Sequence, residues 1–282
     1  MGPDIAAGKQ TRLSRIGYMV PIAGLILAIY GTTLVGVFDE WWNSTEQSQG
    51  LVIVPFALLI AWLRRRSVRA VPAQVDLHGL ILVAAGCSLL LLGKLFAGSY
   101  LSAISFVVVV SGLIWTFWGL PRVRALSLPI LLLILAIPIP TFIYATLSMP
   151  LQQFVSKVAC NLADQLGVVI YREGNILHMA GITVGVWEAC SGLHSLSALM
   201  AGGILMGFTI CNLPLTRTLV WVAAIPIAVV MNIARVTGTA VLADWHPAYA
   251  MGFYHLFSGW LVFVTGACGL YMVAVLLRRA IN

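Results

Sequence analysis

Long apolar runs separated by short polar segments dominate the sequence and restrict what the chain can fold into. A helix needs about 20 mostly apolar residues to cross the hydrocarbon core of a bilayer. Lipid offers no hydrogen-bond partners to the backbone, so segments of this kind cross as helices. The sequence therefore predicts an all-α polytopic membrane protein with one integral domain over residues 1–282. Eight runs fit this template, near residues 16–37, 50–63, 77–97, 100–118, 126–146, 191–210, 218–237 and 254–277.

The composition agrees with this fold class and excludes other classes. Hydrophobic residues make up 61% of the chain and charged residues only 9%, which is too apolar for a soluble domain. The net charge of +7 comes from short basic clusters beside the apolar runs, so no nucleic-acid partner is expected. The five cysteines include no CxxC pair and no Cys/His spacing typical of zinc sites, so neither a metal nor a cofactor is expected.

The positively charged residues indicate how the chain is oriented. When the eight runs are threaded alternately, twelve of the sixteen Lys and Arg residues fall on one side. Short cytoplasmic loops are enriched in these residues, so the sequence predicts a multi-pass inner-membrane protein whose termini are both cytoplasmic. The twelve are Lys9, Arg12, Arg15, Arg64, Arg65, Arg66, Arg69, Arg122, Arg124, Arg217, Arg278 and Arg279.

Two further features concern the fifth run and the segment that follows it. Pro129, Pro138 and Pro140 lie within the fifth run, so kinks or tilts are expected there. The threading places the segment of about residues 148–189 on the outer side of the membrane. This outer segment combines a predicted interfacial amphipathic helix with a short hairpin formed by 176–179 and 182–187. The helix is predicted because apolar Leu151, Phe154, Val155, Val158, Leu162 and Leu166 lie opposite polar Gln152, Gln153, Ser156, Lys157, Asn161 and Asp164.

A cysteine stands where the outer segment meets the sixth run. Cys190 is expected at the N-terminus of that helix, where unpaired backbone N–H groups and the helix dipole favour a thiolate. A thiolate is the reactive form of the side chain, so the position predicts a nucleophile. The alternative is a small cysteine that only packs.

Two residues on the next runs are expected at the same membrane level and on the same side. Arg235, with Asn232 on the same helical face, lies near the predicted outer end of the seventh run, and His255 begins the eighth. An intramembrane arginine indicates function unless it is a snorkelling anchor, and a histidine there can also be merely interfacial. Asn232 would orient a partner or the substrate backbone, or bond a neighbouring helix.

Together these residue types meet the requirements of acyl transfer from a peptide bond. Cys190 supplies the attacking thiolate, His255 a proton donor for the leaving amine, and Arg235 a cation for the developing oxyanion. The sequence therefore predicts a membrane-embedded cysteine protease or transpeptidase.

The motifs also resemble those of the exosortase and archaeosortase family. They are the string at 171–175, the string at 188–193 that contains Glu188, Cys190 and Ser191, Asn232-x-x-Arg235, and His255 with Gly259-Trp260. The resemblance extends over nearly the whole chain and is most specific in its last hundred or so residues. It implies a polytopic enzyme with a Cys, Arg and His set. It also implies exported protein substrates that end in a Pro-Glu-Pro type motif, a transmembrane helix and an Arg-rich tail.

One residue departs from the family pattern, and two other functions stay open. His194 follows Ser-Gly-Leu, four residues after Cys190 on the same face, and competes with His255 for the base role. A serine intramembrane protease using Ser191 is one alternative. The other is an anion transporter or channel lined by Arg235, although transporters usually bind at the midplane and often have repeated halves, neither of which is found here.

Overall fold

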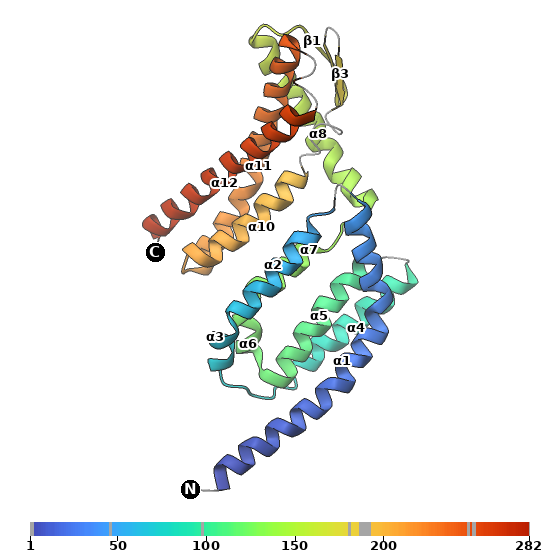
Figure 1. Cartoon of the computed structure of the whole chain (residues 1–282), viewed down its shortest axis with the longest axis vertical. Coiled ribbons are helices and arrows are strands. Elements are labelled where there is room, and N and C mark those ends of the chain that lie inside the picture. Colours follow the sequence, from blue (N-terminus) through green and yellow to red (C-terminus); the bar gives the residue numbers. More distant parts are fainter. Residues whose placement is uncertain are drawn as a thin grey trace.

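The computed structural model of the chain describes residues 3–44, 47–96, 99–179, 182–185, 193–246, 249 and 252–281, which are mostly helical (Figure 1). The helices are α1 (Pro3–Asn43), α2 (Gly50–Leu63), α3 (Arg65–Ala70), α4 (Gly79–Leu95), α5 (Ser99–Trp118), α6 (Leu120–Ala125), α7 (Ser127–Ala136), α8 (Thr141–Gln165), α10 (Leu193–Ile210), α11 (Pro214–Trp245) and α12 (Gly252–Ile281). Each of the eight predicted runs is largely helical in its described part, and the fifth is interrupted between Ala136 and Thr141.

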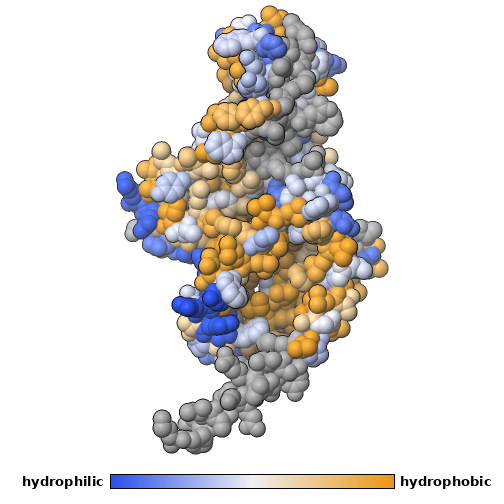
Figure 2. Space-filling model, viewed as in Figure 1, coloured by the Kyte–Doolittle hydropathy of each residue, from blue (hydrophilic) through white to orange (hydrophobic). Residues whose placement is uncertain are grey.

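The helices confirm the predicted class of helical membrane protein. Four segments are long and apolar enough to cross a bilayer, namely Val20–Asn43, Ser99–Trp118, Pro214–Trp245 and Phe257–Ile281, and α7 with α8 makes a fifth if the two form one broken span. Three further apolar helices are shorter, so the count of eight spans stays a prediction. Figure 2 shows hydrophobic side chains gathered over the middle of the molecule, as a lipid-facing surface requires.

The fifth predicted run breaks where its prolines stand. α7 ends at Ala136, and the chain turns by 89° before α8 begins at Thr141. Pro138 and Pro140 donate no backbone hydrogen bond and push the residues before them out of the helical region. The Gln47 carboxamide stabilises the break, since it donates to the carbonyl of Ile139 at 2.6 Å and accepts from its N–H at 2.7 Å. The predicted kink is therefore confirmed, and the run does not continue as one straight helix.

Small residues bring α4 and α5 into close contact. A Cβ atom placed on Gly79 would lie 2.4 Å from the backbone nitrogen of Thr116, and one on Gly86 would lie 2.5 Å from Val109. Only glycine fits at these positions, and this packing of small residues is typical of helix pairs in membranes.

The helices α10, α11 and α12 form a second packed group, whose core includes Leu199, Val220 and Leu270. α10 also contacts α7, which lies along α2 and also contacts α5. This contact joins α10, α11 and α12 to the group of helices that contains α2, α4, α5 and α7. α11 has 32 residues, so at 1.5 Å per residue it is about 48 Å long. It exceeds the hydrocarbon core of about 30 Å.

The far end of α11 packs against α8 and a small antiparallel sheet (Figure 1). The sheet has the order β1-β2-β3, with strands β1 (Ile170–Glu173), β2 (Ile176–Met179) and β3 (Ile182–Gly185). β2 and β3 form the predicted hairpin over its described residues, whereas β1 was not predicted.

The predicted amphipathic helix is the C-terminal part of α8, but its buried face differs from the expected one. Gln152 and Ser156, expected on the polar face, are buried. Asn175 donates to the Gln152 side chain at 3.0 Å, and Ser156 donates to the Gly174 carbonyl at 3.0 Å. The turn between β1 and β2 thus covers this face of α8, which helical periodicity alone does not reveal.

Candidate catalytic site

The structure describes the predicted site residues unequally. Glu188, Cys190 and Ser191 lie outside the described residues. His194 and His255 belong to α10 and α12, but their side chains lie outside the described part of the chain. Arg235 and Asn232 are therefore the two predicted site residues whose surroundings the structure describes.

The Arg235 guanidinium lies against the neighbouring helix α12. A Cβ atom placed on Gly259 would lie 2.9 Å from Nη2 of Arg235 and 3.1 Å from its Cζ. Such distances are shorter than van der Waals contact, so the guanidinium occupies the space that any other residue at 259 would fill. His255 is placed one turn earlier in α12 on the same helical face. The positive charge of Arg235 therefore lies one turn from the position of the predicted acid/base.

The start of α10 lies at about the same level. A Cβ atom on Gly266 of α12 would lie 3.3 Å from the Leu199 side chain of α10. Both helices run away from the sheet end of the molecule (Figure 1), so counting back six residues, about 9 Å of rise, pairs Leu193 with Trp260. α10 thus begins close to the level of Gly259 and Arg235. Cys190 precedes this helix by three residues in the sequence.

The position of Arg235 along its helix differs from the prediction in one respect. The sequence placed Arg235 within the last turn or two of the seventh helix, whereas α11 continues ten residues further, to Trp245. The extension is stabilised by packing, because Ala240 is buried against Ala163 and Val168 near the end of α8. Arg235 consequently projects from the body of α11, and not from its end.

Asn232 lies one turn from Arg235 in α11 and is deeply buried. Its side chain is only 4% exposed, and its Oδ1 atom has no hydrogen-bond partner among the described residues. A buried amide oxygen left without a donor is costly. This favours a role in which a substrate or a residue outside the described part supplies the donor.

A second polar pair, between α2 and α10, was not predicted as functional. The Ser197 hydroxyl donates a hydrogen bond to Oε1 of Gln49 across 148 positions of sequence. Gln49 lies just before α2 and lines two cavities, of about 430 and 220 Å³. The sequence feature that could have indicated this pair is Gln49 itself, directly before an apolar helix. Long polar side chains are rare at membrane depth without a partner.

The histidine of the sheet has structural contacts of its own. His178 on β2 lies 3.5 Å from the Glu173 carboxylate and 3.3 Å from the Thr183 hydroxyl. Among the described residues, no group of three or more His, Cys, Asp or Glu side chains is arranged to hold a metal ion.

Comparison with known families identifies the class of enzyme. The model of the transmembrane exosortase family matches residues 41–272, most of the chain. The chain belongs to the transmembrane exosortase family. No curated protein and no solved structure matches it. Exosortases are membrane-embedded enzymes of the protease and transpeptidase class that process sorting signals of exported proteins, and the resemblance seen in the sequence motifs is thereby confirmed.

Proposed function

We propose that this exosortase-family chain is a cysteine protease or transpeptidase that cleaves the C-terminal sorting signal of exported proteins. The signal would combine a Pro-Glu-Pro type motif, a transmembrane helix and an Arg-rich tail. Cys190 is the nucleophile, His255 the acid/base and Arg235 the oxyanion-stabilising cation. The enzyme lies in the inner membrane with its termini in the cytoplasm and its active site on the outer face.

The contact between the Arg235 guanidinium and Gly259 carries this proposal. It directs the charge of α11 toward α12, at the level where α10 begins, and so toward the chain positions of the other two proposed residues. A side chain that served only as a charged anchor would extend along its own helix toward water. The placement across the helix interface therefore supports a role at a shared site.

The basic segments support the proposed orientation. α3, α6 and the C-terminal end of α12 lie on the side of the molecule away from the sheet (Figure 1), and they carry Arg65, Arg66, Arg69, Arg122, Arg124, Arg278 and Arg279. Positive charge concentrates on the cytoplasmic side of membrane proteins. The sheet end, toward which α10 and α12 begin, is then the outer end.

In the proposed reaction the Cys190 thiolate attacks the carbonyl carbon of the scissile peptide bond. The electron pair of the C=O bond moves onto oxygen, and the Arg235 guanidinium stabilises the negative charge. The tetrahedral intermediate then collapses, the C–N bond breaks, and protonated His255 gives its proton to the leaving amine. A thioester remains on Cys190, and water or an acceptor amine attacks it to release the product and regenerate the thiolate.

The supporting residues have separate roles. Asn232, buried one turn from Arg235, accepts a hydrogen bond from the substrate backbone or orients Arg235. Glu188 and Ser191 flank the nucleophile in sequence and contact the substrate, and His194 assists proton transfer.

The decisive experiment compares Cys190→Ala with Ser191→Ala in membranes that contain a tagged substrate with a complete sorting signal. We expect Cys190→Ala to abolish cleavage and Ser191→Ala to retain it within a few-fold. Hydroxylamine cleaves thioesters, so it should also release the acyl part of the substrate from Cys190 of the wild-type enzyme. The opposite pattern would establish a serine protease, and cleavage retained after both Cys190→Ala and His255→Ala would overturn the cysteine mechanism.

A further inference from the structure

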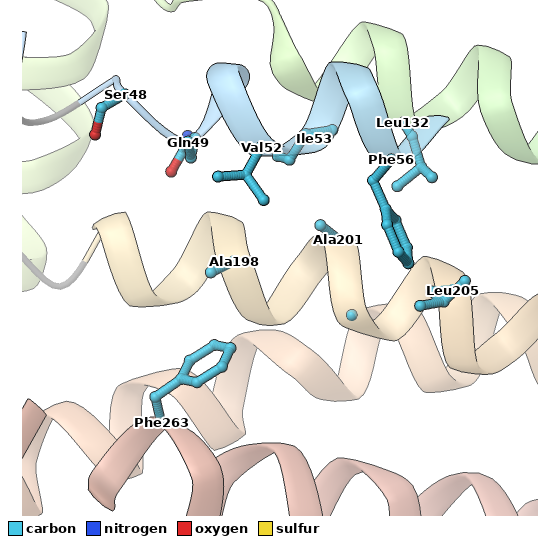
Figure 3. Close-up of a pocket in the computed structure, with 11 residues that line it drawn as sticks. Ser48, Gln49, Val52, Ile53, Phe56, Leu132, Ala198, Ala201, Leu205 and Phe263 are labelled. Carbon is cyan, nitrogen blue, oxygen red and sulfur yellow. The ribbon is translucent and has the colours of Figure 1, made fainter. Parts of the chain in front are cut away.

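A cavity of about 430 Å³ lies between α2, α10 and α12, and Arg235 is not among the described residues that line it. Figure 3 shows Val52 and Phe56 of α2 facing Ala201 and Leu205 of α10 across the cavity, with Phe263 of α12 below. Its lining is apolar except at one end, where Ser48 and Gln49 stand. The cavity therefore combines an apolar body with a single polar mouth.

The wall formed by α10 leaves open space in front of it. A Cβ atom on Gly202, which lines the cavity, would meet no atom within 4 Å. One on the adjacent Gly203 would meet Ala224 and Leu270 at 3.5 Å, inside the packed group of helices. Small residues at such a face let another helix approach closely, so this face of α10 can accept a further apolar segment.

The polar mouth has hydrogen-bonding capacity to spare. Ser197 donates to Oε1 of Gln49, which fixes one end of this carboxamide, while its Nε2 has no acceptor among the described residues. A second cavity, of about 220 Å³, lies on the other side of Gln49 and is lined in part by Met200. The Gln49 amide thus lies between two cavities, and its two N–H donors have no acceptor within the part of the chain that the structure describes.

The length and the direction of the cavity fit the side chains on one face of a short piece of helix. Gln49 and Phe56 at the start of α2, and Ala198 and Leu205 along α10, are each seven positions apart, which is about 10 Å or two helical turns. The polar mouth lies one turn from Leu193, where α10 begins. A chain that leaves the proposed catalytic level and follows α10 would pass Gln49 first and the apolar walls next.

Resting on the proposed function, we propose that this cavity is a subsite for the transmembrane helix of the substrate. Its first two turns, on the C-terminal side of the cleaved bond, place apolar side chains against Val52, Phe56 and Ala201. Gln49 donates from Nε2 to a backbone carbonyl in the extended segment that precedes the helix. The cavity thereby positions the scissile bond beside the start of α10.

The polar mouth favours a polypeptide over a lipid acyl chain. An acyl chain also fills an apolar cavity, but its acceptors are confined to the carbonyl group at its headgroup end. An extended peptide segment next to a helix carries backbone carbonyls that lack intrahelical partners. The order of a donor followed by apolar walls therefore matches a peptide that changes from extended to helical. The small residues Ala201 and Gly202 in the wall favour the helix, because they let another helix approach closely and an acyl chain does not require them.

Filling the cavity tests the subsite. Gly202→Leu places a side chain in open space, and we expect it to reduce kcat/KM for a substrate with a leucine-rich helix by at least tenfold without unfolding the enzyme. Replacing the leucines in the first two turns of the substrate helix by alanine should restore most of the loss. The matched control is Gly269→Leu in α12, because a Cβ there also meets no atom within 4 Å but Gly269 does not line this cavity.

A binding measurement separates this inference from the proposed chemistry. In the Cys190→Ala enzyme, a benzoylphenylalanine at Phe56 should form a photo-crosslink to the substrate helix, and the same probe at exposed Trp62 of α2 should not. Gly202→Leu should remove the crosslink. Wild-type cleavage without a crosslink at Phe56, or a crosslink to lipid alone, would overturn the subsite and leave the proposed function intact. If the wild-type enzyme itself failed to cleave the substrate, the proposed function would be refuted instead.

Discussion

Replacing Gly259 by alanine isolates the placement of Arg235 from its charge. The new Cβ atom would lie 2.9 Å from Nη2 of Arg235, whereas ordinary contacts begin near 3.4 Å. The guanidinium must therefore move by at least about 0.5 Å. Since it is the far end of a flexible side chain, it can do so without displacing either helix. Alanine also favours helix over glycine by up to about 1 kcal/mol, so stability should be unchanged or slightly higher.

The expected cost is to the reaction. Misplacing a catalytic group by about 1 Å costs about 100-fold in rate, and half that displacement gives a loss of about tenfold, which is 1.4 kcal/mol of transition-state stabilisation. The assay follows cleavage of a tagged substrate in proteoliposomes, with thermal unfolding in detergent measured alongside. Gly269→Ala on the same helix is the matched control, because its Cβ meets no neighbour.

A double-mutant comparison decides whether the effect passes through the guanidinium. In an Arg235→Lys background the Nη atoms are gone, so Gly259→Ala should cost much less than it does in the wild type. Two results would refute the reasoning. One is a wild-type cleavage rate in Gly259→Ala. The other is an equal loss in both backgrounds, which would mean that Gly259 matters for a reason other than the placement of Arg235.

Two further predictions concern stability away from the site. Gln47→Ala removes both hydrogen bonds to the backbone of Ile139 between α7 and α8, and should cost about 2–4 kcal/mol of unfolding free energy; an unchanged melting temperature would contradict this. Hydrogen bonds from Trp115 and then His78 lower the pKa of Asp76 below its ordinary 3.8, so its stabilisation is fully present above that value and lost as the pH falls through the lowered pKa. The difference in melting temperature between wild type and Asp76→Asn should accordingly stay constant from neutral pH to about pH 4 and disappear on further acidification.

Much of the fold was predictable because hydropathy is a local property of the sequence. Apolar runs fix where helices form, and Pro138 and Pro140 fix where the fifth run breaks. The extension of α11 to Trp245 was not predictable in this way. It depends on contacts between Ala240 and the end of α8, residues far apart in the sequence. The burial of Gln152 likewise depends on a turn that lies more than twenty residues away.

The features of the candidate site also differ in whether the local sequence predicts them. The chemistry of Arg235 and its proximity to the start of the eighth run follow from residue type and threading. The identity of its contact does not. Gly259 belongs to a family motif, but glycines are common in membrane helices and nothing local shows that a guanidinium lies against this one. The bond between Ser197 and Gln49 joins helices that are adjacent only in the folded chain.

The surroundings of Arg235 bear on whether it is an anchor or part of a site. An anchor lowers its cost by extending along its own helix to water, and this needs no particular residue on the next helix. Arg235 instead crosses to α12, where its guanidinium fills the space left by the missing side chain of Gly259. One turn away, Asn232 is buried with an oxygen for which the described residues supply no donor. The buried Asn232 oxygen carries a cost that an anchor has no reason to bear, and both features support the proposed site, in which a charge and an acceptor face a substrate between α10, α11 and α12.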